Sequence, residues 1–297
     1  MIGMPARLVS VAILAFWLVA AVGLVTRDLL PELLIGDPPD LRTIAGAGDS
    51  AEPARWTIQV ADSASSEALR TVGGAETTSR RKPDGSVRLV SDVWFDAGGL
   101  LKGTPFDTKA RIRLKVLSRY EIDPSGNLDS FRMDVSSMAD PKSRSTADPE
   151  EMGSLSGRVV NHAIDVTARG PLPMMNWTRS FPYQPRSLMQ SALGPLDRLP
   201  GLQVGQRWET RIVSPMTGRI ETVRAEVTRH RTITWGRDKN PVKTREIVHQ
   251  MTPLSAKTWV RPDGLVLRQE VPFPFVKLVL ERLPGRSTDA DAGGRGR

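Results

Sequence analysis

Apolar and charged side chains alternate over residues 109–122, and this alternation constrains the fold more than any other feature of the chain. Charged residues take the odd positions, as Lys109, Arg111, Arg113, Lys115, Arg119 and Glu121. Apolar residues take most of the even positions, as Ala110, Ile112, Leu114, Val116, Tyr120 and Ile122. A repeat of two residues is typical of a β-strand with one buried and one solvated face, whereas a helix would spread these charges around its circumference.

Turn sequences separate further strand-like runs. Residues 86–96 and 221–228 show the same alternation. Three turns combine proline with glycine, which suits a tight reversal: residues 83–85, 123–126 and 262–264. Each turn lies between two strand-like runs and therefore predicts a hairpin. The expected fold is mainly β: an N-terminal transmembrane helix followed by a large curved antiparallel sheet or half-barrel with one short helix.

Residues 8–25 form an apolar run without charge or proline. At ~1.5 Å per residue, a helix of this length roughly spans the hydrocarbon layer of a bilayer. We expect an uncleaved, single-pass anchor in the inner (cell) membrane, with the body on the outer or periplasmic side, because so short a leader is rarely translocated. A small-x-small site at residues 21–23 leaves a cleaved signal peptide as the alternative.

The rest of the chain divides by composition. We expect the anchor in residues 1–27, a flexible tether in 28–54, a first β half in 55–170, a Pro-rich linker with a short helix in 171–201, a second β half in 202–283 and a disordered tail in 284–297. Whether the two β halves share one sheet or form two domains stays open at this stage.

The Pro-rich linker carries aromatic and apolar residues that suggest a ligand-binding lid. A short helix is expected over residues 186–193, with apolar side chains on one face. The lid hypothesis places this helix and its aromatic neighbours across the open face of a curved sheet. Its residues are Trp177, Phe181, Tyr183, Leu188, Met189 and Leu193. The alternative is a plain connection between the two β halves.

Catalytic and metal-binding patterns are missing from the sequence. Without cysteine, the chain excludes disulfides, thiolate metal sites and cysteine nucleophiles. His162, His230 and His249 lack the spacing of a zinc site. We therefore expect a non-enzymatic protein with no catalytic residue, no metal and no cofactor.

The chain is basic, with a formal net charge of +8. Because we expect the body outside the inner membrane, the favoured anionic partners are phospholipid headgroups or other envelope polymers, and not nucleic acid. Arg111, Arg113 and Lys115 share the solvated face of one predicted strand and could contact such a surface. The alternative is ordinary solubilising charge.

The C-terminal part resembles a family of uncharacterised exported bacterial β-domains. A Gly-x-x-Trp entry at residues 205–208 is followed by strands and by the Trp-Val-x-x-Asp-Gly-x-x-Leu pattern at residues 259–267. The best match covers residues 202–282. The family is similar to β regions that precede transglutaminase-like domains and to lipoprotein-carrier half-barrels. Since this chain has no cysteine, any transglutaminase nucleophile would belong to another protein.

The resemblance implies a fold and a compartment, but it implies no chemical reaction. The leading hypothesis is a membrane-anchored extracytoplasmic domain that binds a hydrophobic or cell-envelope ligand, such as a lipid. The alternative is a structural or accessory subunit of an envelope protein complex, with a transglutaminase-like protein as a possible partner.

Overall fold

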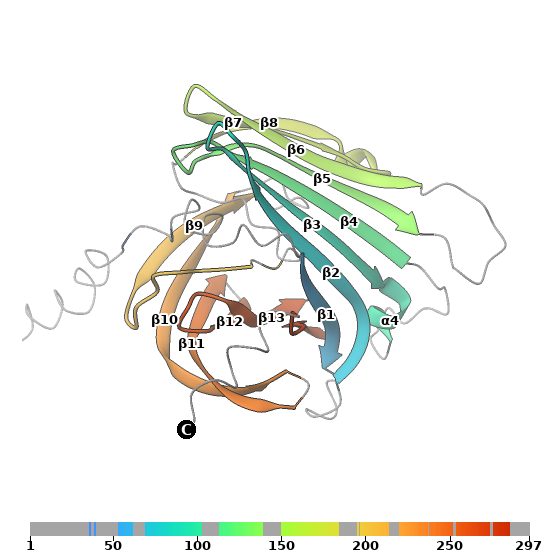
Figure 1. Cartoon of the computed structure of the whole chain (residues 1–297). Coiled ribbons are helices and arrows are strands. Elements are labelled where there is room, and N and C mark those ends of the chain that lie inside the picture. Colours follow the sequence, from blue (N-terminus) through green and yellow to red (C-terminus); the bar gives the residue numbers. More distant parts are fainter. Residues whose placement is uncertain are drawn as a thin grey trace, which may run out of the picture.

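The computed structural model describes a sheet built from most of the chain after residue 53 (Figure 1). The described residues are 36, 39, 53–61, 69–102, 113–138, 150–183, 195, 197–213, 220–236, 238–251, 254–273 and 276–285. The strands of the first half are β1 (Ala54–Ala61), β2 (Leu69–Arg81), β3 (Val87–Asp96), β4 (Arg113–Ile122), β5 (Leu128–Met138), β6 (Glu151–Val160), β7 (Ala163–Arg169) and β8 (Trp177–Pro182). Those of the second half are β9 (Arg207–Val213), β10 (Ile220–Trp235), β11 (Asn240–Met251), β12 (Leu254–Val260), β13 (Val266–Phe273) and β14 (Val276–Arg282). Two short helical segments are α4 (Ala97–Leu101) and η2 (Pro173–Met175).

All these strands belong to one sheet of 14 strands. Consecutive strands pair antiparallel from β1 to β8 and again from β9 to β14, so each half is a meander. The halves meet where β1 pairs antiparallel with β14, with Trp56 opposite Arg282. Among the described strands, β8 and β9 form the two edges, so the sheet is open. In Figure 1 the first half is a broad twisted layer, and the second half curls like part of a barrel.

The predicted strand alternation is confirmed in β4. Val116, Ser118, Tyr120 and Ile122 are buried, while Arg113 and Arg119 are exposed. Residues 109–112 of the predicted strand lie outside the described residues. The alternation predicts burial well because successive side chains of a strand point to opposite faces of the sheet.

The three predicted glycine turns are also confirmed. Gly85, Gly126 and Gly264 have φ values of 83°, 87° and 87°, and they close the β2–β3, β4–β5 and β12–β13 hairpins. A further two-residue turn, Asn161-His162, joins β6 to β7 with φ values of 48° and 62°. His162 is exposed in this turn.

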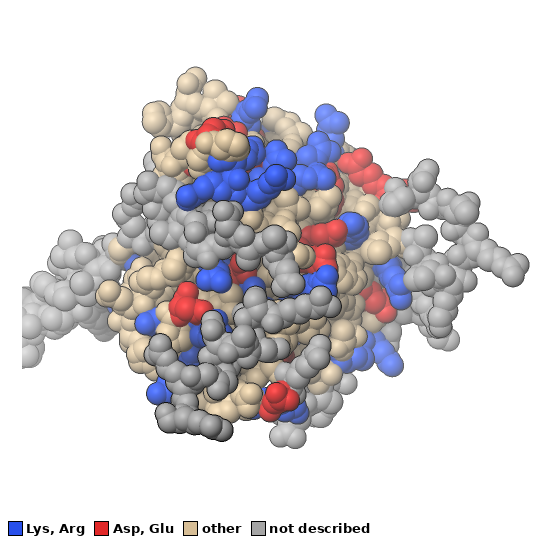
Figure 2. All heavy atoms as spheres, in the orientation of Figure 1, with Lys and Arg blue, Asp and Glu red and all other residues tan. Residues whose placement is uncertain are grey.

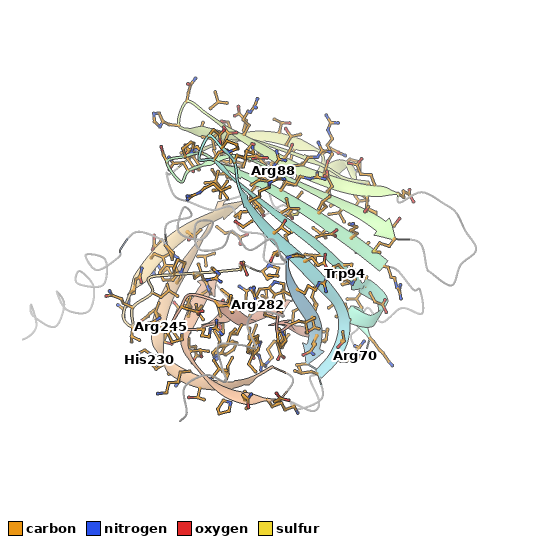
Figure 3. All side chains as sticks on the ribbon, viewed as in Figure 1. Arg70, Arg88, Trp94, His230, Arg245 and Arg282 are labelled. Carbon is orange, nitrogen blue, oxygen red and sulfur yellow. The ribbon has the colours of Figure 1, made fainter. Side chains whose placement is uncertain are left out.

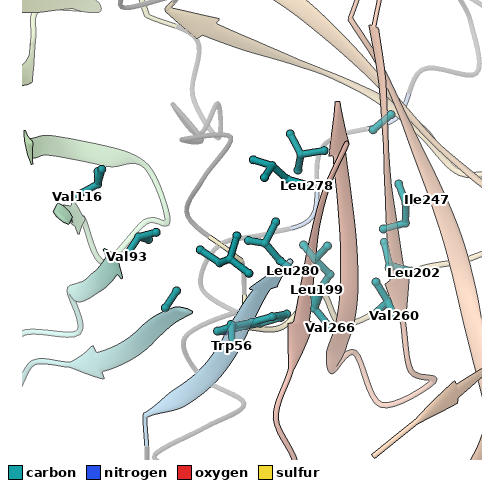
Figure 4. Packing of buried hydrophobic residues seen from close by; sticks show 14 of the residues in the cluster. Trp56, Val93, Val116, Leu199, Leu202, Ile247, Val260, Val266, Leu278 and Leu280 are labelled. Atoms are coloured by element: carbon teal, nitrogen blue, oxygen red, sulfur yellow. The ribbon is translucent and has the colours of Figure 1, made fainter. Parts of the chain in front are cut away.

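The larger buried cluster extends from β1–β4 of the first half across the junction into the second half (Figure 4). Trp56, Ile247, Leu278 and Leu280 contribute from three strands of the sheet, β1, β11 and β14. Leu199 and Leu202 come from the segment between β8 and β9 and join the same cluster, with exposed fractions of 5% and 3%. The described end of the predicted linker therefore packs as part of the core.

That end of the linker is held by backbone pairing to β13 and the turn before it. Leu199 N donates to Gly264 O at 2.7 Å, and Val266 N donates to Asp197 O at 3.1 Å. The side chains of Arg282 and Asp197 also form an ion pair. The linker thus lies against the buried face of the second half and fills part of it.

The predicted helices fall outside the described residues. These are the membrane span at residues 8–25 and the short helix at residues 186–193. In the part of the chain that the structure describes, no helix has the length and apolar character needed to cross a bilayer. The short helix that is described, α4, was not predicted, because the sequence Ala-Gly-Gly-Leu-Leu shows no helical period.

Candidate functional site

The outer face of the first half carries an array of arginines. On β3, Val87 and Val93 are in the core, so Arg88 and its even-numbered neighbours project from the other face, here called the outer face. The register places Arg80 of β2 directly opposite Arg88, and Arg119 of β4 directly opposite Arg132 of β5. Directly opposed residues have Cβ atoms only about 5 Å apart. Two pairs of like charges therefore face one another on this surface.

We define the arginine face as the outer-face residues Arg80, Lys82, Arg88, Arg119, Arg132 and Arg158, of which all five arginines are exposed. Because β2 and β6 are four strands apart, the face is about 19 Å wide. Figure 2 shows Lys and Arg side chains gathered across the upper part of the molecule, where Figure 3 labels Arg88. Such a surface attracts anions.

Two carboxylates within the arginine face are each shared by two bases. Glu121 accepts from Lys82 Nζ at 2.8 Å and from Arg88 Nε at 2.5 Å. Asp134 accepts from Arg132 Nε at 2.8 Å and from Arg119 Nη1 at 3.5 Å. Burial raises the pKa of Glu121, but the hydrogen bonds and charges of Lys82 and Arg88 outweigh it and hold the pKa below its ordinary value.

The arginine face keeps a positive charge after this pairing. Its third acid, Asp165 on β7, lies directly opposite Arg158. Six bases against three acids leave a net charge of about +3 across the face at neutral pH. Asp134 bridges the opposed pair Arg119 and Arg132, whereas no carboxylate bridges Arg80 and Arg88 among the ion pairs of the described residues.

The predicted anionic-surface residues lie at the other end of β4. Arg111 is outside the described residues, Arg113 is exposed at the start of the strand, and Lys115 Nζ binds Asp92 Oδ2 at 2.9 Å. Lys115 is about 13 Å along the strand from Arg119. The predicted strip is therefore not the centre of the arginine face, and one of its charges is balanced by Asp92. Whether Arg113 and Lys115 contact an anionic surface stays a prediction.

Trp94 was not singled out from the sequence, yet it is exposed beside these residues. It is 39% exposed and lies directly opposite Lys115 on one side and Gly74 on the other. Its position was visible in the sequence, because it shares the solvated parity of residues 86–96 with Arg88 and Asp92. Figure 3 labels Trp94 on this part of the sheet.

The described lid residues belong to the edge of the sheet. Trp177 and Phe181 lie on strand β8, and with Tyr183 they pack against a second core cluster that includes Phe131 and Ile164. The Tyr183 hydroxyl accepts from Leu128 N at 2.8 Å, and burial raises the pKa of this hydroxyl. This corrects the placement of the aromatics: they complete the sheet instead of crossing it. Leu188, Met189 and Leu193 lie outside the described residues, and ligand binding by any of the six stays a prediction.

His249 lies partly buried in the second half, beside one aromatic ring and one threonine hydroxyl. Its ring meets Trp208 edge-on at 6.5 Å between centroids, and its Nε2 is 3.2 Å from Thr258 Oγ1. Burial lowers the pKa of His249 to about 4. Within the described ranges, no group of three or more His, Asp or Glu side chains is placed to hold a metal ion. His249 is therefore a partly buried, hydrogen-bonded histidine.

Comparisons with known proteins give little beyond this geometry. A scan against protein families and a search of curated proteins return no match. Among solved structures, a β-barrel-like protein from Brucella abortus, described as a domain of unknown function (DUF1849), aligns with a TM-score of 0.47 and 11% sequence identity. The alignment covers 77% of this chain and 94% of that chain. Such a similarity does not establish function, and the resemblance of residues 202–282 to transglutaminase-associated regions and lipoprotein carriers stays a prediction.

Proposed function

We propose that the chain is a non-enzymatic domain, anchored by residues 8–25 at the outer side of the inner membrane, whose arginine face binds anionic phospholipid headgroups. The observation that carries this proposal is Arg80 directly opposite Arg88, with no carboxylate bridging the two among the described residues, on a face where bases outnumber acids. Like charges directly opposite one another destabilise a sheet. An anionic surface removes this repulsion and gains about 1 kcal/mol for each base that reaches it.

The N-terminal segment supports a location close to the membrane. Gly36 N donates to Arg207 O of β9 at 2.8 Å, so the chain before β1 contacts the body already at residue 36. From residue 25, where the predicted span ends, an extended chain reaches at most about 40 Å by residue 36. The domain would therefore stay near the lipid surface.

The core packing disfavours a hydrophobic ligand in the second half. Leu199 and Leu202 occupy the buried face there, together with Trp56 and Ile247. A groove for an acyl chain would need this apolar surface to be uncovered. The proposal therefore takes the envelope ligand to be a headgroup surface, and a hydrophobic ligand elsewhere on the sheet stays a prediction.

A flotation experiment with the full chain tests the proposal. The protein is mixed from neutral detergent with phosphatidylcholine vesicles that contain or lack phosphatidylglycerol, at low and high salt. Since the apolar anchor contributes to both partition coefficients, their ratio isolates the electrostatic part. We expect a preference for anionic vesicles that weakens with salt, and a fall of up to about 100-fold in the triple variant Arg80→Thr/Arg119→Thr/Arg132→Thr.

A matched variant removes the same charge elsewhere. Arg224, Lys239 and Lys243 are exposed on the β10–β11 hairpin, and their combined replacement by threonine should preserve most of the preference. Equal losses in the two triple variants would show that only net charge matters, which contradicts the proposal. So would a wild-type chain that partitions equally into both vesicles.

An accessory subunit of an envelope complex is the second candidate, and the edge strand β8 favours it. Among the described strands, β8 pairs only with β7, so one side of its backbone is open to an added strand. A photo-reactive residue at Ser180, which is exposed, should then crosslink to a partner protein in native membranes. Crosslinking to lipid alone would contradict this candidate.

A further inference from the structure

Exposed apolar side chains gather at one end of the first half. Of the eight large apolar residues that are exposed in the described part of the chain, five belong to this end: Leu69, Trp94, Met138, Met152 and Leu172. The meander brings them together, because β2 and β6 begin where β3, β5 and β7 end. In Figure 1 the arrowheads of β3 and β5 mark this end, on the right of the sheet. We call these five residues the apolar end.

Two residues of the apolar end project from the outer face itself. Trp94 shares its parity on β3 with Arg88, and Met138 shares its parity on β5 with Arg132. Six residues separate Arg132 from Met138, which corresponds to about 20 Å along the strand. The arginine face therefore continues, on the same side of the sheet, into the apolar end.

Met152 is exposed because it is an extra residue in β6. Val135 of β5 lies opposite Gly153, and the next residue, Ser136, lies opposite Glu151. Met152 is thus left without a partner across the strand pair, and its side chain is 37% exposed. Such a β-bulge changes the direction of a side chain at the end of a strand pair.

Leu172 is held in solvent by the turn that joins β7 to β8. Asn176 Oδ1 accepts from Gly170 N at 3.0 Å, and Asn176 Nδ2 donates to Gly170 O at 3.1 Å and to Leu172 O at 3.2 Å. Pro171 and Pro173 flank Leu172, and each proline fixes its own φ. The turn therefore presents a leucine side chain that is 52% exposed, without help from the core.

The form of the apolar end favours a lipid surface as its partner. From β2 to β7 it spans five strand spacings, or about 24 Å. Charged residues stand among the apolar ones: Glu150 and Glu151 are exposed beside Met152, and Arg113 and Arg169 are exposed on other strands. A protein partner would need a separate pocket for each apolar side chain. Phospholipid headgroups move apart around such side chains, and zwitterionic headgroups meet charges of both signs.

We propose that the apolar end enters the headgroup layer of a phospholipid membrane, with the arginine face against the headgroups beside it. This inference rests on the proposed function, because it gives the membrane contact proposed there an apolar part. A long side chain such as that of Arg113 keeps its charge at the level of the headgroups while its apolar neighbours go deeper. Since the apolar part needs no anionic lipid, it contributes in phosphatidylcholine and at high salt, where the arginine face does not.

A fluorescent label on β6 tests the depth of this contact. The chain has no cysteine, so Met152→Cys takes a nitrobenzoxadiazole label at one position only. Val160→Cys is the matched control, because Val160 is an exposed apolar residue at the opposite end of the same strand. The labelled full chain is reconstituted from neutral detergent into phosphatidylcholine vesicles, with or without phosphatidylglycerol, that contain a lipid with a nitroxide on its acyl chain. We expect emission at shorter wavelength and about two-fold or more stronger quenching at residue 152 than at residue 160, in both vesicles.

The outcomes separate this inference from the proposed function. Equal quenching at residues 152 and 160, in a chain that still prefers anionic vesicles, would overturn the apolar end alone. Stronger quenching at residue 152 without an anionic preference would support the apolar end and contradict the arginine face. Short-wavelength emission without quenching would mean that copies of the chain cover one another there, which also overturns the inference. Leu172→Cys, in the β7–β8 turn, decides the outcome if the label at residue 152 disturbs the fold.

A pair of triple variants tests the same contact without a label. Met138→Ser/Met152→Ser/Leu172→Ser should lower partition into phosphatidylcholine vesicles at high salt by about 10-fold. The control Val160→Ser/Val204→Ser/Leu283→Ser removes the three exposed apolar residues that lie outside the apolar end, and its partition should stay within about two-fold of wild type. Circular dichroism confirms that each variant is folded. Equal losses in the two triple variants would overturn the inference.

Discussion

Arg282 on β14 lies opposite Trp56 on β1, with its guanidinium carbon 5.6 Å from the centre of the indole. The same guanidinium forms an ion pair with Asp197, at the end of the segment that connects the two halves. The side chains of Arg282 and Asp197 are only 13% and 22% exposed. One arginine thus links the two meanders and the connecting segment at the junction of the sheet.

We predict that Arg282→Met lowers the free energy of unfolding by about 2 kcal/mol or more, because it leaves the Asp197 carboxylate largely buried and without its cation. Urea unfolding of the full chain in detergent measures the change. Arg55→Met, on the same strand pair, is the control: Arg55 and Glu76 are 66% and 42% exposed, so its effect should stay within about 0.5 kcal/mol. Similar losses in the two variants would contradict the linking role of Arg282.

Gly264 should be far less tolerant of substitution than Gly85. Both have positive φ, so alanine is strained by about 1 kcal/mol at either position. At Gly264, however, a Cβ would lie 2.7 Å from Pro200 Cα, whereas at Gly85 the nearest atom is Pro124 Cβ at 3.6 Å. We expect Gly264→Ala to cost about 1–3 kcal/mol more than Gly85→Ala in urea unfolding. Equal costs would show that the connecting segment moves freely away from the turn.

This comparison also shows how far the sequence predicts the fold. The glycine in each turn is predictable because a tight turn needs positive φ locally, and the alternation of β4 is predictable because burial follows strand parity. The contact between Gly264 and Pro200 is not predictable, since Pro200 belongs to a Pro-rich stretch whose sequence has no strand or helix period. The pairing of β1 with β14 joins segments more than 200 residues apart, and no local pattern encodes it.

The same holds for the candidate sites: their local patterns are predictable from the sequence, but the contacts between strands are not. The arginine face needed the register, because Arg80 and Arg88 are opposed only once β2 and β3 are aligned. Arg113 and Lys115 were visible as an alternating strip, but the bond from Lys115 to Asp92 of β3 was not. Trp94 packs over Gly74 of the neighbouring strand β2, and this contact depends on the register of β2 and β3. A search for aromatic residues on the solvated parity of predicted strands would have found Trp94, though not the glycine beneath it.

Arg80→Thr should weaken binding to anionic vesicles without destabilising the fold. Because Arg80 faces Arg88, its removal relieves repulsion, and we expect the free energy of unfolding to stay unchanged or rise by up to about 0.5 kcal/mol at low salt. The gain should vanish at high salt, where exposed charges are screened. Arg224→Thr offers the contrast, since Arg224 Nε binds Glu209 Oε1 at 2.8 Å and its loss brings no relief. A clear loss of stability in Arg80→Thr would mean that Arg80 has a structural partner.

His249 should make the protein sensitive to acid over a defined range. Burial lowers its pKa from 6.5 to about 4, so the folded state favours the neutral ring more than the unfolded state does. The contribution of the neutral His249 ring to the free energy of unfolding is fully present above about pH 6.5. It is lost as the pH falls towards 4, and the whole loss amounts to about 3 kcal/mol. Urea unfolding of wild type and His249→Gln between pH 7 and 4 measures this, because the carboxylates titrate in both proteins and cancel in the difference. The wild-type free energy of unfolding should fall more steeply with acid than that of His249→Gln, and parallel pH profiles would show that the ring does not need to be neutral in the fold.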